Sequence, residues 1–449
     1  MLITNATLIT HEEPNRVLPD HALFIENGKI ADLGPQSDLL SAYPGVPRLD
    51  ARAQWVMPGN VCAHTHFYGA FARGLAIPGA APKDFPEILQ RLWWLLDQSL
   101  DEEAVRLSAQ VMLADAIRHG TTTLIDHHAS PNALRGSLAN IARAVEQAGV
   151  RAVLCYEVTD RYGAESTAAS IRENLQFATA VREGNFSPRL AAAFGMHASL
   201  SLSTETLDHC RELAPEDTAF HIHVAEHESD EYDSLARSGT RVVDRLYRHN
   251  LLNARTIVAH AVHIDAHEAV LLAETGAWVT HQPRSNMNNA VGAAQVESLL
   301  RLGIPVCIGT DGFSHTMWQE WKTAYLLHKH EHRDPRRMNG ADVFQMGVHN
   351  NVALANTFFP KTPVGKLIPG YAADLIFVDY HPFTPLTPDN LPWHILFGFD
   401  ESMITTTIAA GQVLMRDREL LTLDESAIAA RAREIAPQIW QRYAQYAAA

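Results

Sequence analysis

Cysteine is scarce in this sequence, and long apolar runs are absent. The 449 residues include four cysteines, widely spaced and without a C-x-x-C pair, which indicates free thiols in a reducing compartment. No apolar run reaches the ~18 residues that a membrane helix needs. The N-terminus lacks the basic and apolar stretches of a targeting segment. We therefore expect a cytoplasmic protein without a membrane partner.

Positive charge is also in short supply. Lys and Arg number 36 against 51 Asp and Glu, and the resulting formal charge of −15 argues against a nucleic-acid partner. Glycine and proline, at 25 and 23 residues, are close to average, which excludes collagen-like and low-complexity chains. We expect a small-molecule substrate as the main partner, and the composition also allows a homo-oligomer.

Short apolar runs alternate with amphipathic stretches through the middle of the chain. Several of these stretches end at a glycine, as helices do, before the next apolar run begins. This alternation predicts an α/β fold with eight βα units, a (β/α)8 TIM-like barrel. A doubly wound open sheet is the alternative, disfavoured because no Gly-rich phosphate loop follows the first strand. The expected strands are 55–63, 122–126, 152–156, 190–195, 219–224, 256–261, 277–280 and 304–309.

Both ends of the chain have a strand pattern instead. Residues 23–26 and 29–34 flank an Asn-Gly turn, which is a hairpin signal, and further strands are expected after Gly365. Neither end is large enough to bury a core alone. We therefore expect residues 1–56 and 357–449 to form one small composite β-sandwich domain, with a helix over 424–447, beside a barrel of residues 57–356.

Histidine is abundant, with 24 residues, and several lie at the ends of expected strands. His64 and His66 are two apart and share a face of their strand, as do His221 and His223. Each pair alone is weak evidence, since two partly buried polar residues explain it equally well. Glu226, three residues after His223, fits a metal site with a proton shuttle. His221 is better explained as a structural, inward-facing histidine.

Two further strand ends carry residues of the same kind. His260 ends the sixth strand, with His263 as a near alternative, and Asp311 follows the eighth. A buried aspartate at that position is costly unless it is paired, and a cation would offset the cost. No lysine lies between Lys83 and Lys322, so a two-metal site bridged by a modified lysine is not expected. The pattern favours one metal ion.

These residues, in this order, resemble the amidohydrolase superfamily and, within it, the mononuclear deaminase branch. A narrower likeness is to the SsnA-type aminohydrolases, through Asn60-Val-Cys-Ala-His-Thr-His-Phe-Tyr, Leu92-Trp-Trp, Asp126-His-His-Ala-Ser-Pro and Arg284-Ser-Asn-Met-Asn-Asn. The branch motifs are Met57-Pro-Gly, Gly120-Thr-Thr-Thr, His223-Val-Ala-Glu226, Ala259-His260, Ser285-Asn286 and Gly309-Thr-Asp311-Gly312.

The resemblance implies one divalent ion, Zn²⁺ or alternatively Fe²⁺, with a position open for water. Its ligands would be His64, His66, His223 and Asp311. Asp311 would also take a proton from the water, Glu226 would protonate a ring nitrogen, and His260 would stabilise the attacking oxygen. Ammonia would then leave.

Five further residues are expected at the substrate. His197 resembles a substrate-contacting histidine of related deaminases. For the others an alternative is open: a structural role for His128, helix packing for Trp93, and an acidic partner for Arg284. Asn286 belongs to the same motif as Arg284.

The leading hypothesis is a metal-dependent aminohydrolase that deaminates an aromatic nitrogen heterocycle, a purine or pterin first and a triazine or pyrimidine second. One alternative is a hydrolase that expels another group, such as halide, or opens a cyclic amide. The other is a metal-free scaffold protein, which should have lost ligand residues that are all present here.

Overall fold

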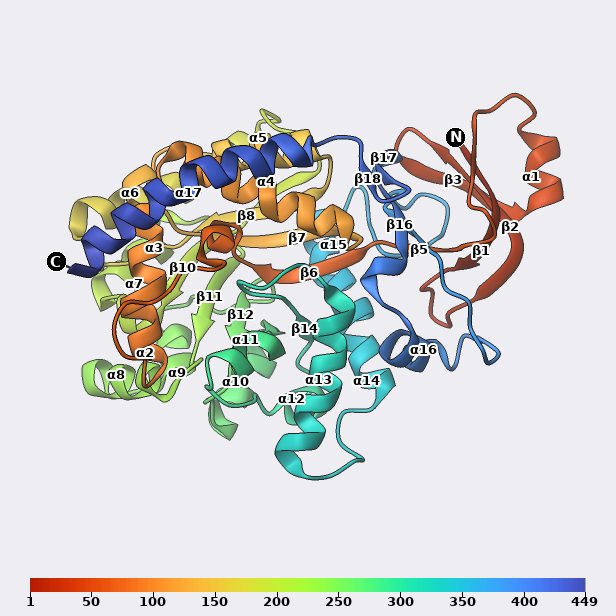
Figure 1. The fold of residues 1–449 in the computed structure, drawn as a ribbon. Helices are drawn as coiled ribbons and strands as arrows, with labels where there is room; N and C mark the ends of the chain where they lie inside the picture. The colour runs from red at the N-terminus through yellow and green to blue at the C-terminus, as the bar shows by residue number, and fades with distance from the viewer. Residues whose placement is uncertain (449) are drawn as a thin grey trace.

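The computed structural model describes residues 1–448, which form one mixed sheet and two parallel sheets (Figure 1). The first parallel sheet has the order β6-β7-β8-β9 and the second β10-β11-β12-β13-β14. Single bridges, Val158 to Met196 and Thr65 to Asp311, link the two sheets. Their strands are β6 (Asn60–Thr65), β7 (Thr121–His128), β8 (Arg151–Tyr156), β9 (Leu190–Ala192), β10 (Phe194–Ala198), β11 (Phe220–Val224), β12 (Ile257–His260), β13 (Trp278–His281) and β14 (Val306–Ile308).

Helices follow most of the parallel strands and cover them. Strands β6, β7, β8 and β11 are buried along their whole length, as expected for parallel strands covered on both faces. The helices of this region are α2 (Phe85–Ile88), α3 (Trp94–Ser99), α4 (Glu102–Arg118), α5 (Ser137–Ala148), α6 (Ala164–Arg182), α7 (Thr204–Leu213), α8 (Glu228–Ser238), α9 (Val242–Arg248), α10 (Ala266–Thr275), α11 (Pro283–Asn288), α12 (Val296–Arg301), α13 (Met317–His332), α14 (Gly340–Phe344) and α15 (Asn351–Phe358).

Local sequence explains where these helices begin and end. At α10, the Asp265 side chain accepts from the backbone of Glu268, whose own side chain accepts from the Asp265 backbone, a capping box. Helix α5 ends at Gly149, whose φ of 91° lies in the left-handed region that glycine adopts without strain. A Cβ at Gly149 would also meet Leu414 at 2.7 Å.

The mixed sheet takes its strands from both ends of the chain. Its path is β18-β17-β16-β15-β5-β1-β2-β3, with β4 paired to β1, and the join is β5 against β15. Figure 1 shows this sheet beside the parallel strands, with the N-terminal strands farthest from them. Its strands are β1 (Leu2–Ile9), β2 (Val17–Glu26), β3 (Lys29–Pro35), β4 (Arg48–Asp50), β5 (Trp55–Pro58), β15 (Leu375–Val378), β16 (Ile404–Ala409), β17 (Gln412–Arg416) and β18 (Glu419–Leu420).

Two expected strands are each divided in the structure. One division adds a strand to the parallel sheets, which have nine strands within residues 1–448, and the other sends its first half to the mixed sheet. The run 55–63 becomes β5 and β6, which lie in different sheets. Gly59 separates them, and a Cβ there would lie 2.4 Å from Thr122, so the chain needs glycine at this close approach. The run 190–195 is divided at Ala193 into β9 and β10.

Three helices lie outside the parallel region of the chain: α1 (Gln36–Ala42), α16 (Leu391–Gly398) and α17 (Glu425–Ala448). Helix α17, drawn in blue, runs back along α3 and α4 (Figure 1). Its buried residues Ile435 and Ile439 belong to the main core. An ion pair of 2.7 Å between Arg431 and Glu103 also joins α17 to α4.

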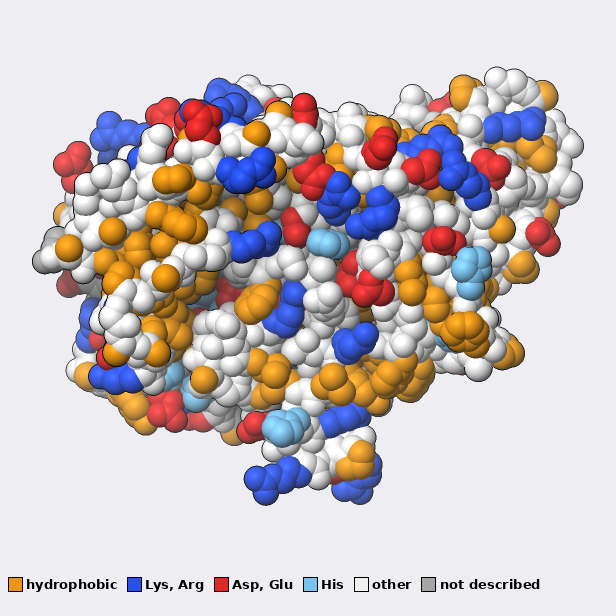
Figure 2. All heavy atoms as spheres, viewed as in Figure 1, with side chains coloured by type: hydrophobic (Ala, Val, Ile, Leu, Met, Phe, Trp, Pro, Cys, Tyr) orange, Lys and Arg blue, Asp and Glu red, His pale blue; other side chains and the backbone are white. Residues whose placement is uncertain are grey.

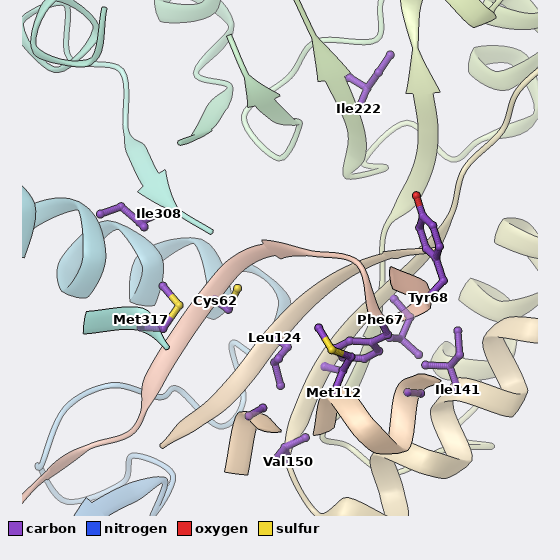
Figure 3. Packing of buried hydrophobic residues seen from close by; sticks show 14 of the residues in the cluster. Cys62, Phe67, Tyr68, Met112, Leu124, Ile141, Val150, Ile222, Ile308 and Met317 are labelled. Carbon is purple, nitrogen blue, oxygen red and sulfur yellow. The ribbon is translucent and has the colours of Figure 1, made fainter. Parts of the chain in front are cut away.

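The main apolar core lies between the parallel strands and their helices. Figure 3 shows Phe67, Met112 of α4 and Ile141 of α5 gathered where these helices pack against the strands. This packing holds the carboxyl ends of the strands in fixed positions. On the surface, Figure 2 shows acidic and basic side chains interspersed over one face. Among residues 1–448, none of the helices has the length and apolar character to span a membrane.

Candidate active site

The carboxyl ends of the parallel strands bring four histidines and one aspartate together. His64 lies in β6, His66 directly follows it, and His223 and His260 lie at or near the ends of β11 and β12. Asp311 lies three residues after β14. One nitrogen or oxygen atom each of His64, His223, His260 and Asp311 lies within 4.8 Å of the others, and all four residues are buried. The structure thus brings together residues that the sequence pattern assigned to one site.

The rings of His66 and His223 are oriented by backbone carbonyls. His66 Nδ1 lies 2.5 Å from the carbonyl oxygen of His127, and His223 Nδ1 lies 2.7 Å from that of His197. A carbonyl can only accept, so each Nδ1 carries the proton and each Nε2 presents a lone pair in the neutral ring. The two Nε2 atoms are 3.2 Å apart. Two facing lone pairs at this distance require positive charge between or on them.

Asp311 contributes negative charge to the same point. Its Oδ1 lies 2.9 Å from His66 Nε2 and 3.4 Å from His64 Nε2, and Ser285 Oγ donates to its Oδ2. Burial opposes ionisation, but the facing rings of His64 and His66 hold the pKa of Asp311 well below its usual range. Burial likewise lowers the pKa of His66, yet Asp311 outweighs it and raises that pKa to about 9. The position therefore attracts positive charge.

The donor set fits a divalent cation. His64 Nε2 and His260 Nε2 are buried and have no hydrogen-bond partner among the described residues, although both face the cluster. Imidazole nitrogen with one carboxylate oxygen is a typical ligand set for Zn²⁺, and Fe²⁺ accepts the same donors. His221 lies behind this set, with its Nε2 2.9 Å from His64 Nδ1, where it orients the His64 ring.

Glu226 and His260 form a second pair beside this cluster. Glu226 Oε2 lies 3.4 Å from His260 Nε2, and Asn289 donates to Glu226 Oε1 at 3.2 Å. Burial raises the pKa of Glu226 to about 7, with His260 acting in the opposite direction. A carboxyl group of this kind can carry a proton near neutral pH.

The backbone is strained at two of these residues. His260 has φ of 74° and Asp311 has φ of 54°, both in the left-handed region that non-glycine residues rarely adopt. Strain of this kind is concentrated at functional sites, where the surrounding packing maintains it. Asn286 holds His260 in place, since its Oδ1 lies 2.9 Å from His260 Nδ1.

A cavity opens onto the cluster. His66, His223, Glu226 and Asp311 lie at its wall, where a substrate would meet them. Apolar and aromatic side chains make up much of the remainder: Tyr68, Phe85, Leu89, Trp93, Trp94 and Leu200. Aromatic walls with a few polar groups suit a small flat molecule.

The expected substrate residues divide into two groups. His197 and Trp93 line the cavity, whereas His128, Arg284 and Asn286 do not. His128 is buried with its Nε2 2.8 Å from Ser130 Oγ, so it acts in packing. The Arg284 side chain does not line the cavity, and its Nε donates to Glu320 Oε1 at 2.6 Å. The acidic partner foreseen as an alternative for Arg284 is Glu320.

A charged group on the cavity wall was not predicted from the sequence. Asp97, Glu157 and Arg161 line the cavity together, and Glu157 also lies 3.1 Å from His127. A signal was present, because Glu157 directly follows the apolar strand β8, the same position that identified the other site residues. Asp97 lies in helix α3 and Arg161 in the segment after β8, where strand-end reasoning gives no guidance.

Comparison with known proteins agrees with this geometry. Residues 55–414 match the amidohydrolase family, and the chain belongs to that family. It is 31% identical over 98% of its length to 5-methylthioadenosine/S-adenosylhomocysteine deaminase of Pelotomaculum thermopropionicum, of which 99% is covered. It is also 31% identical to 5'-deoxyadenosine deaminase of Methanosarcina barkeri, with the same coverage of both chains.

A solved structure shares the fold across the whole chain. An adenosine deaminase from Xanthomonas campestris with bound zinc superposes with a TM-score of 0.85 at 25% identity, covering 98% of each chain. The deaminase resemblance seen in the sequence is thus confirmed at the level of the family. The divalent character of the expected metal is supported by the donor set described above together with this zinc-bound neighbour.

Proposed function

We propose that this protein is a metal-dependent hydrolytic deaminase that acts on an aminated nitrogen heterocycle of the purine type. The observation that carries the proposal is the arrangement of His66, His223 and Asp311 around one cation-attracting point, with Glu226 and His260 beside it. All of these residues except His260 line one cavity with aromatic walls.

Four residues would hold the metal: His64, His66, His223 and Asp311. Their donors match Zn²⁺, which we take as the native metal, with Fe²⁺ as the alternative. A divalent ion bound there would activate a water molecule as the nucleophile. The single carboxylate and the absence of any lysine from 84 to 321 favour one ion per chain.

The protein side chains then divide the proton transfers. Asp311 takes a proton from the attacking water, and Glu226 delivers a proton to the ring nitrogen beside the carbon under attack. His260 donates a hydrogen bond to the attacking oxygen and stabilises the charge that develops there. A carbon–oxygen bond forms, the amino group accepts the proton that Asp311 took from the water, and the carbon–nitrogen bond breaks as ammonia leaves. The remaining hydroxyl proton goes to Glu226, which restores its starting form.

The purine class is favoured by the relatives and by the cavity. Two relatives are named for deamination of adenine nucleosides. Trp93 and Trp94 offer flat surfaces for a heterocycle to stack on, and His197 stands on the same wall. His197 Nδ1 lies 2.7 Å from Ser201 Oγ, which donates onward to the carbonyl of Ala198, so His197 Nε2 is an acceptor toward the cavity.

We also infer that the two parallel sheets close into one barrel and that the mixed sheet is the core of a composite domain of residues 1–56 and 357–449. The two bridges between the parallel sheets and the pairing of β5 with β15 support this division. A cytoplasmic location is supported by the four cysteines, all free and buried.

Ammonia release tests the proposed function. The protein, loaded with Zn²⁺, is assayed with adenosine, 5'-deoxyadenosine, adenine, guanine and an aminated pterin, before and after treatment with a chelator. We expect ammonia in equal amount to the oxo product from at least one purine, loss of activity on chelation, and recovery when Zn²⁺ is restored. Ammonia release from none of these compounds, or full activity after complete metal removal, would refute the proposal.

A further inference from the structure

The guanidinium of Arg161 has a donor that nothing in the proposed reaction uses. Arg161 follows β8 by five residues and lines the cavity. Its Nη2 lies 3.3 Å from Asp97 Oδ2 and 3.9 Å from Glu157 Oε2, and its Nε donates to Thr159 Oγ1 at 3.0 Å. Its Nη1 is buried and has no hydrogen-bond partner within residues 1–448.

The position of this guanidinium is fixed on several sides. It lies over the Trp94 ring, 4.8 Å from its centre, and 5.0 Å from the centre of the Tyr162 ring. Tyr162 also donates to Asp97 Oδ1 at 2.8 Å, which anchors the carboxylate that holds Arg161. A side chain this constrained presents its free donor in one direction at little entropic cost.

An unpaired charged donor in a buried position is costly, and native proteins rarely leave one without a reason. A second buried donor on the same wall is also unpaired among the described residues, the Nε1 of Trp94. Two unpaired donors on one cavity wall indicate a ligand that brings acceptors to this side.

The surrounding charge decides what kind of acceptor fits. Asp97 and Glu157 already balance the cation, and Glu226, Asp230 and Asp311 add further carboxyl groups to the cavity lining. A phosphate or carboxylate group would bring more negative charge into these surroundings. A neutral oxo group accepts hydrogen bonds from a guanidinium without that penalty.

We propose that Arg161 is a specificity-determining residue that donates from Nη1 to an exocyclic oxo group on the heterocycle. The inference rests on the proposed function and narrows its substrate class to aminated purines that also carry a ring oxo group. A preference for an oxo group would distinguish the substrate of this chain from those of the relatives named for adenine nucleosides, because adenine has no oxo group.

Two matched substrate pairs test the inference. Guanine and 2-aminopurine share the amino group at C2, and only guanine carries an oxo group, at C6. Isoguanine and adenine share the amino group at C6, and only isoguanine carries an oxo group, at C2. We expect the wild-type protein to have a higher kcat/KM for the oxo member of its preferred pair. R161K keeps a cation beside Asp97 and Glu157 but loses the second amino group. It should lower kcat/KM for the oxo member by ~10- to 100-fold, the worth of one charged hydrogen bond, and change the other member less than about 3-fold.

The matched control is R135K, at an exposed arginine that pairs with Glu165 and does not line the cavity. It should leave the substrate preference unchanged. Binding provides a readout independent of turnover: xanthine, the product of both guanine and isoguanine, should bind wild type more tightly than R161K in calorimetry. R161M is the second variant if R161K does not fold.

The outcomes separate the inference from the function on which it rests. If R161K lowered kcat/KM equally for both members of a pair, Arg161 would have a structural role and the inference would be overturned. Preference of the wild type for adenine or 2-aminopurine would overturn it while leaving the deaminase function intact. Ammonia release from none of the four purines would overturn both the inference and the purine class.

Discussion

Replacement of Glu226 by glutamine separates proton transfer from metal binding. The Glu226 carboxyl is buried, and Asn289 donates to its Oε1 at 3.2 Å. The amide oxygen of glutamine can accept the same hydrogen bond, so the local packing should be preserved. Glutamine cannot deliver a proton, and general acid catalysis typically contributes ~10²–10⁴-fold. We therefore expect E226Q to lose ~10²–10⁴-fold in kcat, which corresponds to about 3–5 kcal/mol of barrier.

Metal content should be unchanged in E226Q, because Glu226 is not among the four proposed ligands. The assay measures ammonia release, metal per chain and thermal midpoint on the same preparations. E228Q is the matched control, since Glu228 is exposed and lies only two residues away. An E226Q protein with near wild-type turnover would refute the proton-transfer role, and loss of its metal would show that Glu226 is a ligand.

The pH profile offers a second check on the same residue. Burial raises the pKa of Glu226 to about 7. Since a general acid must carry its proton, the active form predominates below that pH and is lost above it. The kcat/KM of the wild type should therefore fall as the pH rises through about 7. A profile that instead rises steadily from pH 6 to 9 would contradict this assignment.

Three further variants test other parts of the account. H223A should lose the metal and the activity together. H209A, a control at an exposed histidine, should keep both, as measured by elemental analysis and ammonia release. R284M should leave the buried carboxyl of Glu320 without its partner and lower the free energy of unfolding by ~3 kcal/mol, with KM unchanged. A change in KM without a change in stability would instead indicate that Arg284 contacts the substrate. Burial lowers the pKa of His11 to about 3, so below about pH 6.5 the unfolded chain binds a proton that the folded chain does not. The free energy of unfolding therefore decreases as the pH is lowered below about 6.5. H11Q should show a smaller drop in thermal midpoint between pH 7 and 5, and an identical drop would contradict this.

The order of strands and helices could be predicted well from the sequence, because buried parallel strands are continuous apolar runs and their helices end at glycines such as Gly149. Boundaries were wrong where the deciding contact is distant in sequence. The run 55–63 reads as one strand, and only the contact of Gly59 with Thr122 shows why the chain leaves one sheet for another.

The grouping of the site residues could also be predicted from the strand pattern. His64, His223, His260 and Asp311 could be placed together because the carboxyl ends of parallel strands meet at one end of the sheet. Arg284 could not be assigned, since its partner Glu320 lies 36 residues away on α13. Roles that depend on the direction of a side chain in a connecting segment require the tertiary structure.

The central claim is that four side chains at the strand ends hold one catalytic cation. The most direct test is elemental analysis of the purified protein, with metal counted per chain. Our account predicts about one Zn²⁺ or Fe²⁺ per chain, with ammonia release proportional to its occupancy. Two metals per chain in this cluster, or a protein that retains full activity without metal, would contradict it.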